Sequence, residues 1–100
     1  MERKQEIPIT IWLEDPRIER DGDFFIAYAD GLKLLGCGLT EIEAVESLTD
    51  AIKVSFMALD ERGILFKTLD KRGIPYEEEI IRKTTDNRPL KPFLMGVSPR

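Results

Sequence analysis

The spacing of hydrophobic residues changes near residue 40, from every second residue to every third or fourth. The later spacing predicts one long amphipathic helix from Glu41 to about Arg62, because residues three and four apart share a helix face. Its predicted buried face carries Ile42, Val45, Leu48, Ile52, Phe56 and Leu59, widened by Ala44, Ala51 and Ala58. Its polar face carries Glu43, Glu46, Asp50, Lys53 and Glu61. Gly63 can adopt the left-handed conformation that ends helices.

Thr40 and Glu43 have the spacing of a reciprocal helix cap. The Thr40 side chain is expected to accept a hydrogen bond from the backbone N–H of Glu43, and the Glu43 carboxylate to accept one from the N–H of Thr40. Two backbone donors at the helix start would thereby be paired.

The alternating spacing predicts strands before the helix. From Ile7 to Leu13, isoleucine and leucine occupy every second position, which is typical of a half-buried strand, and Pro8 indicates an edge or a first strand position. Asp21-Gly22 predicts a chain reversal, so a hairpin partner should follow. In that second strand we expect the bulky residues Phe24, Ile26 and Tyr28 to join the isoleucine face. Asp30-Gly31 predicts another turn before a short third strand from Lys33 to Cys37.

After the long helix the chain repeats one pattern: residues 59–64 read LDERGI and residues 69–74 read LDKRGI. This predicts two similar helix ends and a second, short helix over about Leu65–Arg72. Residues 76–82 fit either a strand or a helical turn, and we favour the strand. The sequence thus predicts an α+β domain over residues 1–82, with three or four antiparallel strands backed by one helix, and a basic, proline-containing tail over 83–100.

Composition narrows the function. The chain has 100 residues, 42% of them hydrophobic, and no apolar run long enough to cross a bilayer. Neither a secretory signal nor a cofactor motif is evident, and the single cysteine, Cys37, makes the cytoplasm the expected location. The absence of histidine removes the commonest general base and metal ligand. We therefore expect no catalytic or metal site.

Charge is unevenly distributed along the chain. Residues 1–81 carry a net charge of −8, whereas residues 82–100 carry +4. An acidic body favours a basic protein partner over nucleic acid. Candidate partner-binding residues are Glu46, Asp50, Val54 and Met57 on the polar side of the long helix. Candidate residues for tail docking or homo-oligomer formation, as a dimer or tetramer, are Phe93, Leu94, Met95 and Val97. In an alternative reading, Lys83, Arg88, Lys91 and Arg100 contact nucleic acid.

Two other sets of residues have a structural and a functional interpretation. Cys37, between Gly36 and Gly38, is either an activated thiol or a small buried strand residue, and the lack of histidine favours the second. The two glycines indicate a bulge or close packing of strand and helix. The aspartates Asp15, Asp21, Asp23 and Asp30 lie in predicted turns, where aspartate is common, and we assign them no catalysis.

Two strings of the sequence resemble the HicB-like antitoxin family over about residues 7–73. They are DGDFFIAY, residues 21–28, and GLTEIEA, residues 38–44, in which Gly38, Thr40, Glu43 and Ala44 match the family's helix start. The resemblance implies a sheet backed by a helix, similar to a degenerate ribonuclease H core. It also implies a non-enzymatic antitoxin that neutralises a small basic RNA-cleaving toxin of the HicA type, or a solitary relative of one, in a homo-oligomer.

Overall fold

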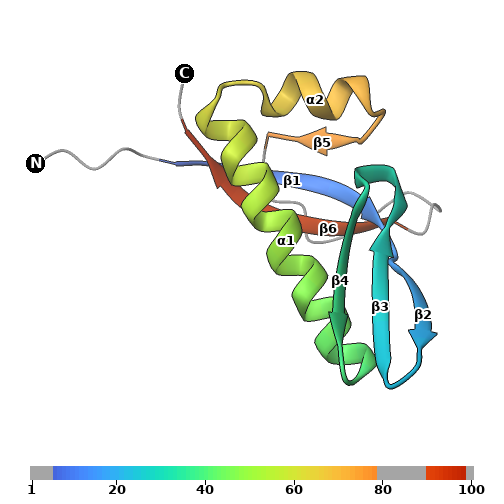
Figure 1. Cartoon of the computed structure of the whole chain (residues 1–100). Coiled ribbons are helices and arrows are strands. Elements are labelled where there is room, and N and C mark those ends of the chain that lie inside the picture. Colours follow the sequence, from blue (N-terminus) through green and yellow to red (C-terminus); the bar gives the residue numbers. More distant parts are fainter. Residues whose placement is uncertain (1–5, 79–89, 99–100) are drawn as a thin grey trace, which may run out of the picture. The chain divides into compact units, whose positions relative to one another are not determined.

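The computed structural model describes residues 6–78 and 90–98, which form two helices and two antiparallel sheets of three strands each (Figure 1). The elements are β1 (Ile7–Glu14), β2 (Arg17–Asp21), β3 (Phe24–Ala29), a 3₁₀ turn η1 (Asp30–Leu32), β4 (Leu34–Gly38), α1 (Glu41–Glu61), α2 (Leu65–Lys71), β5 (Tyr76–Glu77) and β6 (Leu90–Val97). The predicted α+β class is confirmed. The strands, however, form two sheets, where the sequence predicted one.

The chain divides into two compact units. The first comprises Met1–Glu14 and Leu59–Arg100, and the second comprises Asp15–Ala58. The boundary therefore falls between β1 and β2 and again near the C-terminal end of α1.

In the first unit, β1 is the central strand of the sheet β5-β1-β6. It pairs with β6 over eight residues, from Ile7 opposite Val97 to Glu14 opposite Leu90, and with β5 only at Thr10 and Ile11. The predicted hairpin between β1 and the strand at Phe24 is therefore wrong. Pro8 precedes the part of β1 that is paired on both sides, as its missing N–H requires.

Residues 90–97, which the sequence placed in a tail, form strand β6. The backbone N–H of Ser98, just after β6, donates to the Asp60 carboxylate at 2.9 Å. Residues 76–77 form the strand favoured for that segment, whereas residues 79–82 lie outside the described part of the chain. Among the described residues of the first unit, the buried ones are Ile9, Thr10, Ile11, Leu65, Leu69 and Val97. Three of these are consecutive, so both faces of β1 are covered there, and the prediction of a half-buried strand is wrong at that point.

Both helices end as the repeated pattern predicts. Gly63 and Gly73 have φ angles of 71° and 69°, and the following isoleucine in each case bonds back into the last turn. The bonds are Gly63 N–H to Asp60 C=O (2.9 Å), Ile64 N–H to Leu59 C=O (3.0 Å), Gly73 N–H to Asp70 C=O (3.1 Å) and Ile74 N–H to Leu69 C=O (2.9 Å). These pairings satisfy carbonyls that a helix end otherwise leaves unpaired.

In the second unit, the sheet order is β2-β3-β4, and β2 is a strand that the sequence did not predict. Its sequence, RIERD, has one apolar residue, and all five residues are exposed. The hydrophobic pattern therefore contained no signal for it. The reversal predicted at Asp21-Gly22 is confirmed, because Asp21 pairs with Phe24 across a turn in which Gly22 has a φ of 62°.

Glycines bring β4 against α1. A Cβ added at Gly36 would lie 2.7 Å from the Cα of Leu48, and one at Gly38 would lie 2.7 Å from the backbone N of Ala44. Only a glycine strand can approach a helix backbone so closely. The close packing predicted from these glycines is confirmed, and Figure 1 shows α1 running alongside β4.

The face of β3 that lies with these glycines carries Phe25, Ala27 and Ala29, since Phe25 pairs with Gly38 and Ala27 with Gly36. Ala27 is fully buried and pairs with Gly36, whereas Phe24 is 52% exposed. The prediction that Phe24, Ile26 and Tyr28 form the core side is therefore wrong, because the residues that alternate with them, Phe25, Ala27 and Ala29, lie on the side of Gly36 and Gly38, which packs against α1. Along α1 the buried residues are Ala44, Leu48, Ile52 and Phe56. Ile42, expected in the core, is 71% exposed.

Candidate functional site

The start of α1 is fixed by Thr40 and Glu43. The Thr40 hydroxyl accepts a hydrogen bond from the Glu43 N–H at 3.1 Å, as predicted, and the Thr40 carbonyl accepts one from the Ala44 N–H at 3.0 Å. The Glu43 carboxylate, however, accepts from the N–H of Leu39 at 3.2 Å and not from that of Thr40. The cap thus reaches one residue further back, into the link from β4, and holds the strand-to-helix junction.

The four candidate partner-binding residues lie on the outward side of α1. Glu46 and Asp50 are exposed, and Val54 and Met57 are 67% and 47% exposed. Steps of four, four and three residues place them in one row along the helix. Ile42 lies one further step of four toward the N-terminus, so its exposed side chain extends the row. We call Ile42, Glu46, Asp50, Val54 and Met57 the α1 strip.

The α1 strip combines apolar and acidic side chains. Within residues 6–78 and 90–98, no cation pairs with Glu46 or Asp50, and no group of carboxylates and cysteine is arranged to hold a metal ion. Its two carboxylates are therefore available to a positively charged partner, and its three apolar side chains offer surface to bury.

Cys37 is exposed, so the prediction of a buried cysteine is wrong. In β4, Gly36 and Gly38 face α1, and side chains alternate along a strand, so Cys37 and Leu35 point to the opposite face. Leu35 is 56% exposed. Cys37 and Leu35 pair with Ile26 and Tyr28 of β3, which therefore share this face. The bulky residues expected in the core thus line the outer side of the sheet.

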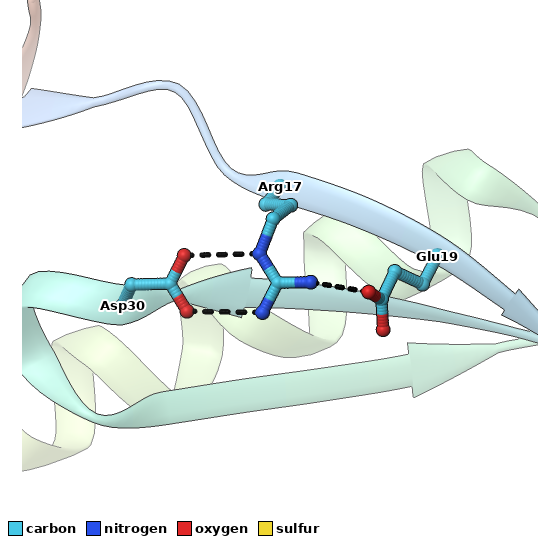
Figure 2. Close-up of polar contacts among 3 residues, drawn as sticks. All are labelled: Arg17, Glu19 and Asp30. Atoms are coloured by element: carbon cyan, nitrogen blue, oxygen red, sulfur yellow. Dashed lines mark hydrogen bonds and ion pairs between the residues drawn. The ribbon is translucent and has the colours of Figure 1, made fainter.

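Arg17, Glu19 and Asp30 form a cluster of charged side chains that the hydrophobic pattern of the sequence did not predict (Figure 2). Arg17 donates two hydrogen bonds of 3.1 Å to the two carboxylate oxygens of Asp30, and a third nitrogen contacts Glu19. The Arg17 guanidinium also lies 4.3 Å from the centre of the Tyr28 ring. The hydrogen bond from Arg17 lowers the pKa of the Asp30 carboxyl below its ordinary value and raises the pKa of Arg17. The cluster joins β2 to the end of β3.

The other three turn aspartates are not bonded to Arg17. Asp15 lies between β1 and β2, Asp21 ends β2, and Asp23 lies in the turn that follows it. Only Asp30 among the four bonds to Arg17.

Some of the candidate oligomer-forming and nucleic-acid-binding residues near the C-terminus lie in the described part of the chain, and the others lie outside it. Phe93, Leu94, Met95 and Val97 lie in β6, where Val97 is buried and Leu94 is 48% exposed. Lys91 lies in β6 opposite Leu13. The remaining basic candidates, Lys83, Arg88 and Arg100, lie outside the described residues.

Comparisons with known proteins returned no match: no family model, no curated protein and no solved structure matches this chain. In the described part of the chain, neither helix is long and apolar enough to pass through a membrane.

Proposed function

We propose that this chain is a non-enzymatic protein-interaction domain that binds a basic protein partner through the α1 strip. One observation carries the proposal: an isoleucine, a valine and a methionine stand exposed on the outward side of a helix, in one row with two carboxylates. Exposed apolar side chains framed by charge are typical of protein-binding surfaces.

The partner that fits the α1 strip is a basic surface with an apolar groove. Burying Val54 and Met57 would supply affinity at roughly 1–2 kcal/mol each, because both side chains are only partly exposed in the free chain. Glu46 and Asp50 would act mainly on the rate and orientation of association, since charge at the rim of an interface steers the encounter. The two pairs of residues therefore have separable effects.

The resemblance to the HicB-like family suggests which basic protein this is. We propose a small RNA-cleaving toxin of the HicA type, which the chain would neutralise as an antitoxin, or another small basic protein if the chain is a solitary relative. The alternative of nucleic-acid binding depends on Lys83, Lys91, Arg88 and Arg100, and no feature of the described residues favours it over the α1 strip.

The test is binding of the full chain to a purified, catalytically inactive toxin of the HicA type encoded beside its gene, measured by surface plasmon resonance. The double variant Val54→Ala/Met57→Ala should raise the dissociation rate, with a loss of affinity of about 10- to 100-fold. Glu46→Lys/Asp50→Lys should lower the association rate and remove most of its salt dependence.

The matched control is Glu14→Lys/Glu77→Lys, which changes the net charge equally on exposed residues of the other unit. It should leave most of the association rate intact. If both charge-reversed variants lower the association rate by the same factor, the net charge of the chain and not the α1 strip controls binding. If no small basic protein binds the wild-type chain, the antitoxin proposal fails.

A further inference from the structure

The outer face of the β2-β3-β4 sheet carries a second exposed apolar surface, distinct from the α1 strip. Its members follow from the strand register and form three rows across the sheet: Arg17, Tyr28 and Leu35; Glu19, Ile26 and Cys37; and Asp21 with Phe24. Phe24 and Leu35 are more than half exposed, and Cys37 is exposed. A sheet with an apolar face is normally covered by another layer.

We propose that a second copy of this chain covers this outer sheet face, packed face to face about a two-fold axis through the middle row. Such an axis, perpendicular to the strands, lays each strand antiparallel over the same strand of the other copy. Residues of the first row then meet residues of the third row, and residues of the middle row meet themselves. The α1 helices lie on the opposite faces of the two sheets and do not obstruct the contact.

The charges on this face are complementary under that symmetry. On β2 the outward residues are Arg17, Glu19 and Asp21, so the axis places each Arg17 over the Asp21 of the other copy. The two Arg17–Asp21 pairs lie at opposite ends of the contact, with Glu19 between them, and each Arg17 is shared with Asp30 and Glu19 of its own chain. A two-fold axis parallel to the strands would instead lay β2 over β4, which carries no charge, so Arg17 and Asp21 would have no charged partner in the other copy.

The apolar residues match under the same symmetry. Tyr28 meets Phe24 of the other copy, an aromatic pair of the kind that stabilises packed sheets. Ile26 and Cys37 lie in the middle row, so each faces its own equivalent across the axis. The uncharged strand β4 thus covers β4, and the charged strand β2 covers β2.

Cys37 is the chain's only cysteine, so it reports this geometry directly. Stacked sheets lie about 10 Å apart, too far for a disulfide between two strand cysteines but within reach of a short bis-maleimide. The reagent should convert the wild-type chain to a covalent dimer. Light scattering without the reagent should show a mass that rises from 11.5 kDa toward twice that value between about 1 μM and about 1 mM protein.

Two variants test the surface, each with a control. Leu35→Lys buries a charge in the contact and should weaken self-association at least 10-fold, whereas Leu94→Lys, at a similarly exposed leucine of the other unit, should not. Asp21→Arg sets two arginines together and should weaken it several-fold, whereas Asp23→Arg, in the adjacent turn, should not. A mass of 11.5 kDa at every concentration overturns the proposal. So does a dimer that is indifferent to Leu35→Lys and Asp21→Arg, or one that fails to cross-link at Cys37.

Discussion

The two faces of the β2-β3-β4 sheet differ in what packs against them: α1 covers one face, and the other carries exposed apolar side chains. The face against α1 carries Phe25, Ala27, Gly36 and Gly38, whereas the outer face carries Phe24, Ile26 and Tyr28. Ala27 is fully buried, and Phe24 is 52% exposed. The two glycines let α1 pack directly on β4, which places the core on their face of the sheet. Phe25 lies on the helix face beside Gly38 and is half-buried, so the size of a side chain alone does not decide its face.

The largest effect on stability is expected from adding a side chain to β4 on the face that packs against α1. A methyl group at Gly36 would meet the backbone of Ser47 and Leu48, where neither a side chain rotation nor a small shift makes room. Gly36→Ala should therefore lower the free energy of unfolding by about 2–4 kcal/mol, measured by urea denaturation. Gly31→Ala is the control, because a Cβ there has no atom within 4 Å. Equal losses for both variants would show that the helix does not lie as close to β4 as described.

An intermediate effect on stability is expected from removing a large side chain from the outer face. Phe24→Ala removes an entire aromatic ring, but the ring is already half exposed, so the loss should be about 1 kcal/mol or less at protein concentrations too low for self-association. The measurement is the same urea titration at low and at high protein concentration. A methyl added at Gly36 should thus cost more than a ring removed at Phe24. The reverse order would contradict the assignment of the two faces.

The comparison also separates what the sequence predicts from what it does not. The helices, their ends at Gly63 and Gly73, and the Thr40 cap follow from local signals, since the interacting residues are three to five positions apart. The α1 strip was largely predictable for the same reason, because a polar helix face is visible in the spacing. Ile42 was misplaced because its spacing fits two faces of the helix: it lies three residues before Val45 but also four before Glu46, in the outward row.

The features that were not predictable depend on distant pairing or on unusual composition. Ile7 pairs with Val97, at the far end of the chain, and no local pattern connects them. The strand β2 is almost entirely charged, so only its pairing with β3 identifies it as a strand, and the sequence pattern does not show that pairing. The Arg17 cluster on β2 was missed for the same reason. The outer sheet face was missed because size was taken as a guide to burial. The fold class was thus predictable, whereas the sheet partners and the choice of core face were not.

The smallest effect is expected at the charged edge of the outer face, in its response to pH. Arg17 holds the pKa of Asp30 below its ordinary value, so ionised Asp30 is favoured in the folded chain. A depressed folded-state pKa contributes stability that is complete above the pKa of an unfolded aspartate, about 4, and is lost as the pH falls through the folded-state value. Asp30→Asn should therefore lower stability at pH 7, and the difference from the wild type should shrink toward pH 3.

The same comparison in an Arg17→Met background isolates the cause. Without the guanidinium, Asp30 has lost the hydrogen bonds that lower its pKa, so the effect of Asp30→Asn should no longer depend on pH in this range. Urea titrations of the four chains at pH 7, 5 and 3 measure it. Both groups are exposed, and salt should weaken the effect, in contrast to the effect of Gly36→Ala, which is steric. A pH-dependent difference that persists without Arg17 would place the origin of the Asp30 shift elsewhere on the sheet, and the charged edge would then lose its assigned role of joining β2 to β3.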